Sequence, residues 1–237
     1  MGLNGIYAMD ISCLDEHEVC LGEPYLLFDW KEAIPKGTNG GSPATINWSP
    51  DGTKVVISIE NKLILANEDG EHAIYLTGDC AAANWPKWSP DGGQIAFIFN
   101  PGRLPDCEML ESSQIQLYNL ETGEMQPILS DVLAPSRINW LPEGKMAYIS
   151  RISETDYREV IRIVDREGKL LQQIPENPGD FTSLIGLDFS PDGNRLAFVG
   201  DIVPESGAWK TDIYISDLNT NSILNLTNGS GDNFDPV

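Results

Sequence analysis

The sequence is poor in the residues on which catalysis and nucleic-acid binding depend. Its 237 residues include two histidines and four cysteines, and 15 basic residues stand against 36 acidic ones. The net charge of −21 argues against nucleic acid or an anionic membrane as a partner, because both are bound through basic patches. No apolar run approaches the roughly 18 residues of a membrane-spanning helix. The composition, with 41% hydrophobic residues, indicates an acidic globular protein whose charge favours solubility.

Recognisable catalytic and cofactor motifs are also missing. The sequence has no Gly-x-Ser-x-Gly, Cys-x-x-Cys, His-Glu-x-x-His or phosphate-binding loop. His17 and His72 each fall in or beside a predicted turn, without a serine motif. We therefore expect no enzymatic activity, no catalytic residue, no metal site and no cofactor. Residues 229–235 are faintly similar to an oxygen-rich calcium loop, but a polar loop between repeats is the interpretation we favour.

A short motif is repeated along the chain. Proline presets φ for the second position of a type I turn, and glycine takes the left-handed position that closes it. Each copy follows one apolar run and precedes another, so each predicts the tip of a β-hairpin. The four copies are Trp48-Ser-Pro-Asp-Gly52, Trp88-Ser-Pro-Asp-Gly92, Trp140-Leu-Pro-Glu-Gly144 and Phe189-Ser-Pro-Asp-Gly193. We expect Leu-Pro-Glu-Gly in place of Ser-Pro-Asp-Gly in the third copy to change little.

Each repeat reads as four strands, and its second strand is nearly all apolar, which indicates burial on both faces. Four-stranded units with a period of about 40–50 residues are typical of a β-propeller. We therefore predict an all-β fold of four-stranded antiparallel blades within a single domain, 1–237. The predicted blades span about 44–76, 82–129, 136–174 and 183–227.

The two ends of the chain predict parts of further blades. Residues 5–11 and 24–30 fit the third and fourth strands of a half blade, 5–30, with an acidic loop between them. Residues 233–237 resemble the start of another blade. We therefore expect about four full blades plus a half blade in an incomplete, open propeller. The first and last blades would not pack together, and the chain expressed alone would dissolve poorly or self-associate.

Several of these segments resemble the repeat of TolB-type β-propellers. The resemblance rests on the Trp-Ser-Pro-Asp-Gly tips, on Asp212-Ile-Tyr-Ile-Ser-Asp217 and on Leu224-Asn-Leu-Thr-Asn228, and it covers essentially the whole chain. It implies a bacterial, extracytoplasmic propeller, periplasmic or at the cell surface, that binds a protein or small ligand without catalysis. One alternative is the gating propeller of a prolyl-oligopeptidase-type serine peptidase whose catalytic domain is absent here. Another is the sensor or substrate-binding domain of a surface lipoprotein. A downstream Gly-x-Ser-x-Gly segment or an upstream lipobox would distinguish them.

Blade topology predicts where a partner binds. The long, varied loops emerge on one face and the short tips on the other, and binding residues favour varied loops on a rigid scaffold. Among the tryptophans outside the repeated motif, Trp30, Trp85 and Trp209, we expect Trp209 to be the best contact residue. The candidate binding residues on this long-loop face are Asp106, Glu108, Glu154, Asp156, Tyr157, Phe181, Asp201 and Trp209.

The four cysteines are predicted to form two disulfides. Cys13 and Cys20 frame one short loop, and Cys80 and Cys107 belong to the same repeat on the long-loop face. The pairs Cys13–Cys20 and Cys80–Cys107 would suit an oxidising compartment. Four free thiols in a cytosolic protein are the alternative.

Overall fold

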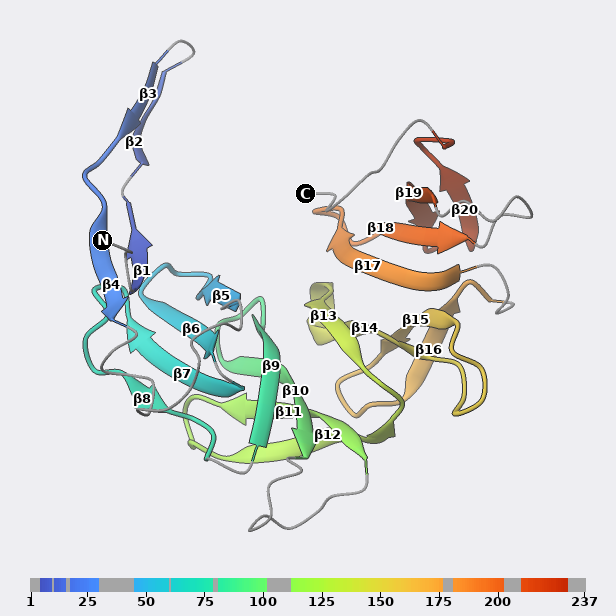
Figure 1. The fold of residues 1–237 in the computed structure, drawn as a ribbon, viewed down its shortest axis with the longest axis horizontal. Coiled ribbons are helices and arrows are strands. Elements are labelled where there is room, and N and C mark those ends of the chain that lie inside the picture. The colour runs from blue at the N-terminus through green and yellow to red at the C-terminus, as the bar shows by residue number, and fades with distance from the viewer. Residues whose placement is uncertain are drawn as a thin grey trace.

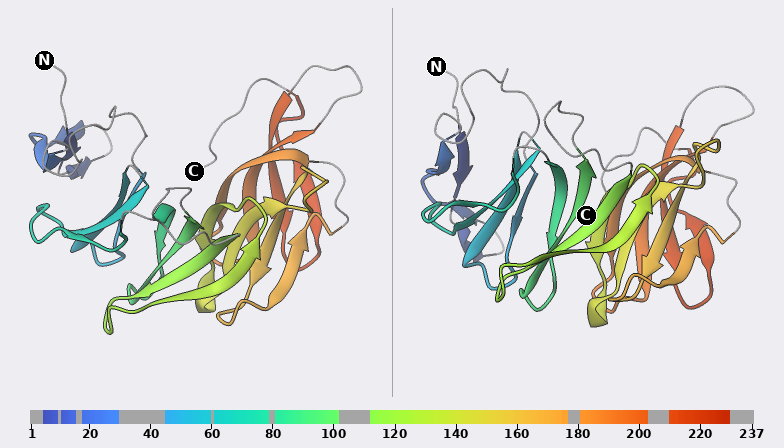
Figure 2. Two further views of the ribbon diagram at one scale, coloured as in Figure 1. Left: turned by 60° about the horizontal axis from the view of Figure 1, so that its bottom comes forward. Right: turned by 90° about the horizontal axis from the view of Figure 1, so that it is seen from below.

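The computed structural model describes residues 5–9, 11–15, 18–29, 45–59, 61–78, 81–101, 112–176, 181–202 and 210–229. Four four-stranded antiparallel sheets stand side by side along an arc (Figure 1), and they are seen on edge in Figure 2. Within each sheet the strands follow chain order, with the first at the inside of the arc and the last at the outside. This arrangement confirms the predicted β-propeller blades.

The first two sheets each contain four strands. The first sheet consists of β5 (Thr45–Trp48), β6 (Lys54–Ile59), β7 (Lys62–Asn67) and β8 (Ile74–Tyr75). The second consists of β9 (Ala81–Trp88), β10 (Gln94–Pro101), β11 (Ser113–Asn119) and β12 (Met125–Val132).

The remaining two sheets repeat this order. The third consists of β13 (Ser136–Trp140), β14 (Met146–Arg151), β15 (Glu159–Val164) and β16 (Leu170–Ile174), with a short 3-10 turn, η1 (Pro142–Gly144), between its first two strands. The fourth consists of β17 (Phe181–Phe189), β18 (Arg195–Ile202), β19 (Lys210–Asp217) and β20 (Ser222–Asn225).

The hydrophobic core lies in layers between neighbouring sheets. The second strand of each repeat is the most buried, as its apolar sequence predicts; Ile95, Ala96, Phe97 and Ile98 of β10, for example, have no exposed surface. The layer between the third and fourth sheets combines aliphatic side chains of β14 and β15 with a cluster of aromatic rings from β17, β18 and β19. Each sheet therefore needs a neighbour to cover its face.

Hydrogen bonds of a serine and an aspartate stabilise the hairpin tips. In the first tip, Ser49 Oγ donates to Asp51 Oδ1 at 2.6 Å and accepts from the Lys54 amide at 2.9 Å, while the Thr53 amide donates to the same carboxylate. Gly52 closes the turn with φ +73°. The same three bonds recur in the tips that begin at Ser89 and Ser190.

The third tip is built differently, so the prediction that Leu-Pro-Glu-Gly in place of Ser-Pro-Asp-Gly changes little is wrong. Leu141 has no hydroxyl to bind the turn, and Glu143 adopts φ +65° next to Gly144 at φ +74°. Arg166 compensates by donating from Nε to the Glu143 carbonyl at 3.0 Å. The Arg166 side chain occupies the space where a Cβ on Gly144 would lie.

The segment before the first full sheet contains one more hairpin than predicted. β1 (Gly5–Ala8) pairs antiparallel with β4 (Tyr25–Asp29), in agreement with the predicted strand pair. Between them, β2 (Ile11–Asp15) and β3 (Glu18–Leu21) form a separate two-stranded sheet where the sequence predicted a loop. This hairpin projects from the end of the arc (Figure 1). Few apolar residues alternate along these two strands, and acidic residues surround them. The sequence pattern therefore does not indicate the hairpin.

Candidate functional site

The inner strands of all four full sheets line one groove on the concave side of the arc. Its volume is about 500 Å³. Each strand contributes the three residues that immediately precede its motif aromatic, so the groove repeats the same register four times. The lining residues are Thr45, Ile46 and Asn47 of β5, Trp85, Pro86 and Lys87 of β9, Arg137, Ile138 and Asn139 of β13, and Gly186, Leu187 and Asp188 of β17. We call this set the central groove.

Three of the four inner strands carry a bulge in the central groove. The residue three positions before the motif aromatic has a positive φ in each of them: +56° at Trp85, +50° at Arg137 and +68° at Gly186. Strand pairing shifts register at the same places in β9, β13 and β17. Positive φ is unfavourable for bulky residues, and bulges serve to redirect side chains. Gly186 adopts the positive φ without strain because glycine has no Cβ, whereas Trp85 and Arg137 adopt a positive φ despite their large side chains.

Two basic side chains and one aromatic ring meet in the central groove. The Arg137 guanidinium lies over the Trp85 ring, with Cζ 3.6 Å from the ring centroid. This is a close cation–π contact between two neighbouring sheets. Burial lowers the pKa of Lys87 from its usual value; the Asp188 carboxylate opposes this change, and the charge of Arg137 adds to it. The groove thus concentrates positive charge in a strongly acidic protein.

Backbone and side-chain hydrogen bonds hold the groove strands in place. The indole of Trp88 donates to the Asn47 carbonyl, and that of Trp140 donates to the Lys87 carbonyl, each at 3.0 Å. Asn139 Nδ2 donates to the Leu187 carbonyl at 2.9 Å. These bonds tie each lining triplet to a neighbouring sheet, so the groove walls are fixed by the packing of the sheets.

One polar atom of the groove strands has no partner. Thr45 Oγ1 is buried and makes no hydrogen bond within the part of the chain that the structure describes. A buried hydroxyl without a partner is costly, and such groups are found where water or a ligand completes the bonding. Thr45 occupies in β5 the position that Trp85, Arg137 and Gly186 occupy in the other three strands.

Electrostatic interactions connect the central groove to the β14–β15 loop. Glu159, at the start of β15, accepts a hydrogen bond from the Leu184 amide at 2.7 Å. Burial raises the pKa of Glu159, while this bond and the charges of Arg151 and Arg137 act in the opposite direction. Arg151 in turn lies 4.8 Å from the ring centroid of Tyr157. These interactions link the loop surface electrostatically to the groove wall.

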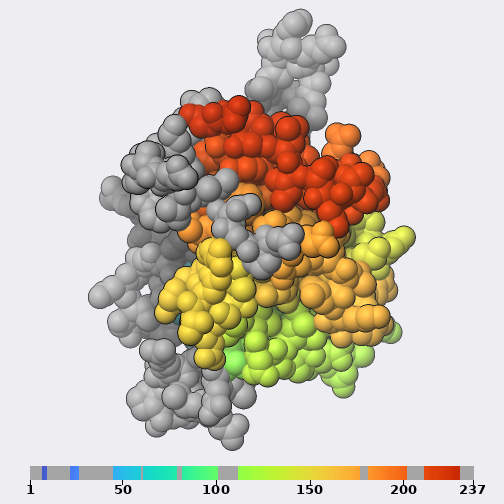
Figure 3. Space-filling view, turned by 90° about the vertical axis from the view of Figure 1, so that its right-hand side faces the viewer, coloured from blue at the N-terminus to red at the C-terminus, as the bar shows by residue number. Residues whose placement is uncertain are grey.

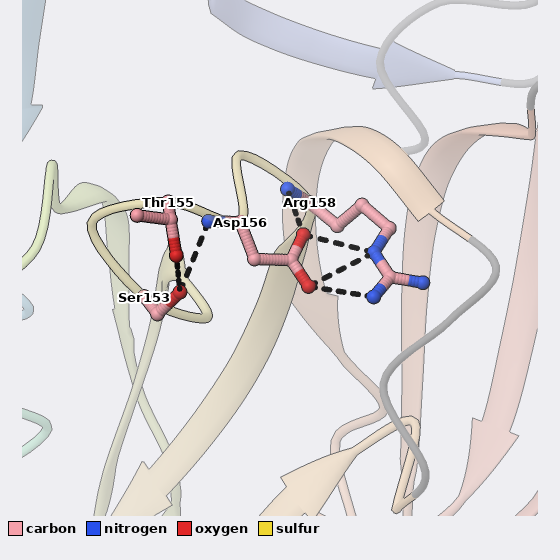
Figure 4. A network of polar contacts seen from close by, with 4 residues as sticks. All are labelled: Ser153, Thr155, Asp156 and Arg158. Carbon is pink, nitrogen blue, oxygen red and sulfur yellow. Dashed lines mark hydrogen bonds and ion pairs between the residues drawn. The ribbon is translucent and has the colours of Figure 1, made fainter.

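The β14–β15 loop holds three of the predicted binding residues. Arg158 donates two hydrogen bonds to the Asp156 carboxylate, from Nε to Oδ1 at 2.9 Å and from Nη2 to Oδ2 at 2.6 Å (Figure 4). This pairing holds the pKa of Asp156 at about 2. Glu154 is exposed, and Tyr157 is 65% exposed. The loop lies at the surface beside the fourth sheet (yellow in Figure 3).

Of the other predicted binding residues, the structure describes Phe181 and Asp201, which lie at the paired ends of β17 and β18. Phe181 is 3% exposed and packs against Phe198 and Tyr214, so its ring supports the core and is not available to a ligand. Asp201 lies near the end of β18, and partial burial raises its pKa. Asp106, Glu108, Trp209, Cys80, Cys107 and residues 230–235 lie outside the described residues.

The sequence alone does not reveal the central groove, because its residues are of ordinary types for strands. Trp85 lies outside the repeated motif, and Lys87, Arg137 and Asp188 belong to no known motif. Their shared position relative to the motif aromatic is the clue, since residues at one register in successive repeats face the same axis. Of the motif tryptophans, Trp88 and Trp140 are buried, whereas Trp48 is 44% exposed.

The described residues offer no conventional metal site. No group of three or more His, Cys, Asp or Glu side chains within the described ranges is arranged to hold a metal ion. The search for membrane-spanning helices among the same residues also finds none.

Comparisons with known proteins agree on the fold. No family model matches this chain, and no curated protein matches its sequence. Its structure is similar to that of TolB from Acinetobacter baumannii, with a TM-score of 0.61 and 17% identity over 86% of this chain and 46% of TolB. It is also similar to an oligogalacturonate lyase in complex with manganese, with a TM-score of 0.60, 14% identity, and coverage of 86% of this chain and 55% of the lyase.

A third similar structure is described as having an open velcro topology. The β-propeller domain of the Trilobed protease from Pyrococcus furiosus, with its open velcro topology, gives a TM-score of 0.56 and 14% identity, covering 78% of this chain and 56% of that domain. The chain spans about half the length of these three proteins. They show that the fold is a β-propeller, similar in structure to TolB and to other propellers. They include a lyase and part of a protease, so the fold alone assigns no activity.

Proposed function

We propose that this chain is a non-catalytic binding module of the TolB type, in which the central groove receives the ligand or partner. The observation that carries the proposal is the fourfold repeat of the groove register, with bulges at Trp85, Arg137 and Gly186. Strained backbone at bulky residues persists where surrounding structure enforces it, and it clusters at binding sites. Loops and inner strands of a rigid scaffold are common places for ligand sites.

Binding is favoured over catalysis by the chemistry of the groove. Its lining residues include no serine, cysteine or histidine that could form a nucleophile–base pair. His72 lies in the turn between β7 and β8, where its Nδ1 is 3.3 Å from Asn67 Nδ2. A site with two cations, an aromatic ring and amide side chains is suited to holding a ligand by charge and shape.

The β14–β15 loop extends the proposed binding surface. Tyr157 is exposed and its ring is held by Arg151, which shares an electrostatic environment with Glu159 and Arg137. A small ligand would occupy the groove alone, while a protein partner would contact this loop as well. The acidic residues expected on the long-loop face, Glu154 and Asp156 among them, would then meet the rim of a protein partner.

Amide NMR during a fragment screen tests this placement. We expect binding fragments to shift resonances of the lining residues in β9 and β13 first, followed by the loop at 152–158. Shifts confined to the tips at Ser49, Ser89 and Ser190 would contradict the proposal. A fragment set that contains neutral and charged members keeps this test independent of ligand charge.

We also propose an extracytoplasmic location, supported by the β2–β3 hairpin. Cys13 and Cys20 are direct cross-strand partners in its register. Residues opposite each other in an antiparallel pair have Cα atoms about 4.5–5.5 Å apart, within the range of disulfides. We expect mass spectrometry of unreduced protein to find peptides linked through Cys13 and Cys20. Alkylation of both thiols without prior reduction would count against an oxidising location.

A further inference from the structure

We infer that the central groove recognises an anionic group, a carboxylate or phosphate, through Lys87 and Arg137 against the ring of Trp85. This inference rests on the proposed function and names the ligand chemistry of the same site. The groove differs in charge from the chain as a whole. The groove lining contains two cations and one carboxylate, Asp188, whereas the whole chain carries a net charge of −21.

The geometry of Arg137 suits a planar anion. Its guanidinium lies with Cζ 3.6 Å from the Trp85 ring centroid, so the ring covers one side of the cation and restrains the side chain. A guanidinium presents its N–H donors in its own plane and matches the two oxygens of a carboxylate or phosphate. An arginine held in this way loses less conformational freedom on binding than one that is free to rotate.

Lys87 supplies the second charge from the neighbouring strand. It precedes Trp88 by one residue, as Asn139 precedes Trp140, so β9 and β13 present these side chains at the same register. Its ammonium makes no hydrogen bond and no ion pair within 4.0 Å among the described residues, although Asp188 lies within electrostatic range. A half-buried ammonium in this setting gains from an added anion, because burial has removed part of its hydration.

The apolar part of the groove indicates what the anion is attached to. Ile46 and Leu187 keep part of their surface exposed in the groove lining, whereas Pro86 and Ile138 are buried. A small organic acid or phosphate ester with an apolar or ring-shaped body would contact both surfaces. A free inorganic anion would use the cations alone and bind more weakly.

The test uses benzoate as the carboxylate probe, benzyl alcohol as its neutral analogue and inorganic phosphate as the bare anion. Affinities are measured at about 0.15 M NaCl, where the Debye length is about 8 Å and the overall negative charge is largely screened. We expect benzoate to bind at least about tenfold more tightly than benzyl alcohol, since hydrogen bonds to charged groups are the stronger class. Its amide shifts should centre on Trp85, Lys87 and Arg137.

Two variants separate the local role of Lys87 from the general effect of charge. Lys87→Gln should weaken benzoate binding about tenfold and leave benzyl alcohol unaffected. Lys169→Gln removes the same charge from the exposed turn between β15 and β16 and should change neither affinity. Arg137→Lys keeps the charge but removes the planar donor pair, and it should weaken benzoate more than phosphate. A comparison of unfolding midpoints checks that each variant folds.

The outcomes distinguish this inference from the proposed function. Equal binding of benzoate and benzyl alcohol in the groove, unchanged by Lys87→Gln, would overturn the anion inference and leave the groove as the binding site. Benzoate shifts that map outside the groove would overturn both. Loss of benzoate affinity in Lys169→Gln as large as in Lys87→Gln would show that overall charge acts, and it would also refute the inference.

Discussion

Gly200 of β18 shows how closely single residues are fitted in the fourth sheet. A Cβ added at this position would lie 2.5 Å from Cδ1 and 2.7 Å from Cε1 of Phe181. The Phe181 ring is itself held edge-on against Tyr214, with centroids 4.9 Å apart. The ring has no space to move away, so the absence of a side chain at 200 is a packing requirement.

Gly200→Ala is therefore expected to lower the free energy of unfolding by about 1–3 kcal/mol, the usual cost of overpacking a core. Gly78→Ala is the matched control, because a Cβ there meets no atom within 4 Å. Chemical denaturation of both variants measures the difference. Equal stability of the two would contradict the close packing of Phe181 on β18.

The aspartates of the hairpin tips should make the protein sensitive to acid. Hydrogen bonds from Ser49 and Thr53 hold the pKa of Asp51 at about 2, and Ser190 and Asn194 do the same for Asp192. A carboxyl with a lowered pKa in the folded state stabilises the fold above its unfolded pKa of roughly 3.9 and loses that effect as pH falls through about 2.

The variant Asp51→Asn/Asp192→Asn should therefore be less stable than the natural protein at pH 7. The difference should shrink between about pH 4 and pH 2, because the aspartates of the natural protein become protonated there. Urea denaturation over this pH range measures it. A difference that stays constant with pH would show that the carboxylate charge does not stabilise the tips.

At the scale of the sheets, the indole bonds join each blade to the one before it. Trp88 and Trp140 are buried and donate across the interface, whereas Trp48 makes no indole hydrogen bond to any described residue. At the last interface, Phe189 has no donor, and the Asn139 amide provides the bond instead. The same motif position thus has a different energetic role in different blades.

Trp88→Phe and Trp140→Phe should each destabilise the fold by about 1–3 kcal/mol, since a carbonyl within the interface loses its donor. Trp48→Phe is the control, with an expected change below about 0.5 kcal/mol for an exposed position. Thermal or chemical unfolding of the three variants measures these changes. An equal loss at all three positions would show that ring size, and not the indole bond, is what matters.

The sequence predicts the hairpin tips and the buried strands but not the β2–β3 hairpin or the central groove, and the reasons are physical. The tips and the apolar second strands are specified locally by Pro, Asp, Gly and short apolar runs, so their positions could be predicted. The β2–β3 hairpin could not, because only Ile11 and Cys13 mark the alternation of its first strand. The groove depends on positive φ at Trp85 and Arg137, which neither residue type favours, so it emerges only when the sheets pack together.

At the scale of the whole molecule, the charge of −21 opposes compaction. Like charges on a folded chain repel one another, and salt shortens the range of this repulsion from about 30 Å at 10 mM to about 8 Å at 0.15 M. The described ion pairs are few and local, such as Lys145–Glu143 at 3.1 Å, so screening removes more repulsion than attraction.

We therefore expect the unfolding midpoint to rise as NaCl increases from 10 mM to about 0.15 M. A series of thermal melts measures the rise, with choline chloride at matched ionic strength as the control for specific cation binding. An unfolding midpoint that falls with salt would mean that attractive charge pairs dominate the fold. A rise seen with sodium but not with choline would point to a sodium site instead.

The direction of the indole bonds has a consequence for how the chain is made. In the first two interfaces the acceptor carbonyls, of Asn47 and Lys87, precede their donors by 41 and 53 residues. A ribosome completes each acceptor sheet before the tryptophan that binds it emerges, and domains tend to fold in order of synthesis. Each new blade can thus attach to a finished template. The Asn139 amide, whose acceptor Leu187 lies 48 residues later, must wait for chain that has not yet been translated, as must Ser58 Oγ, which donates to the Ala83 carbonyl.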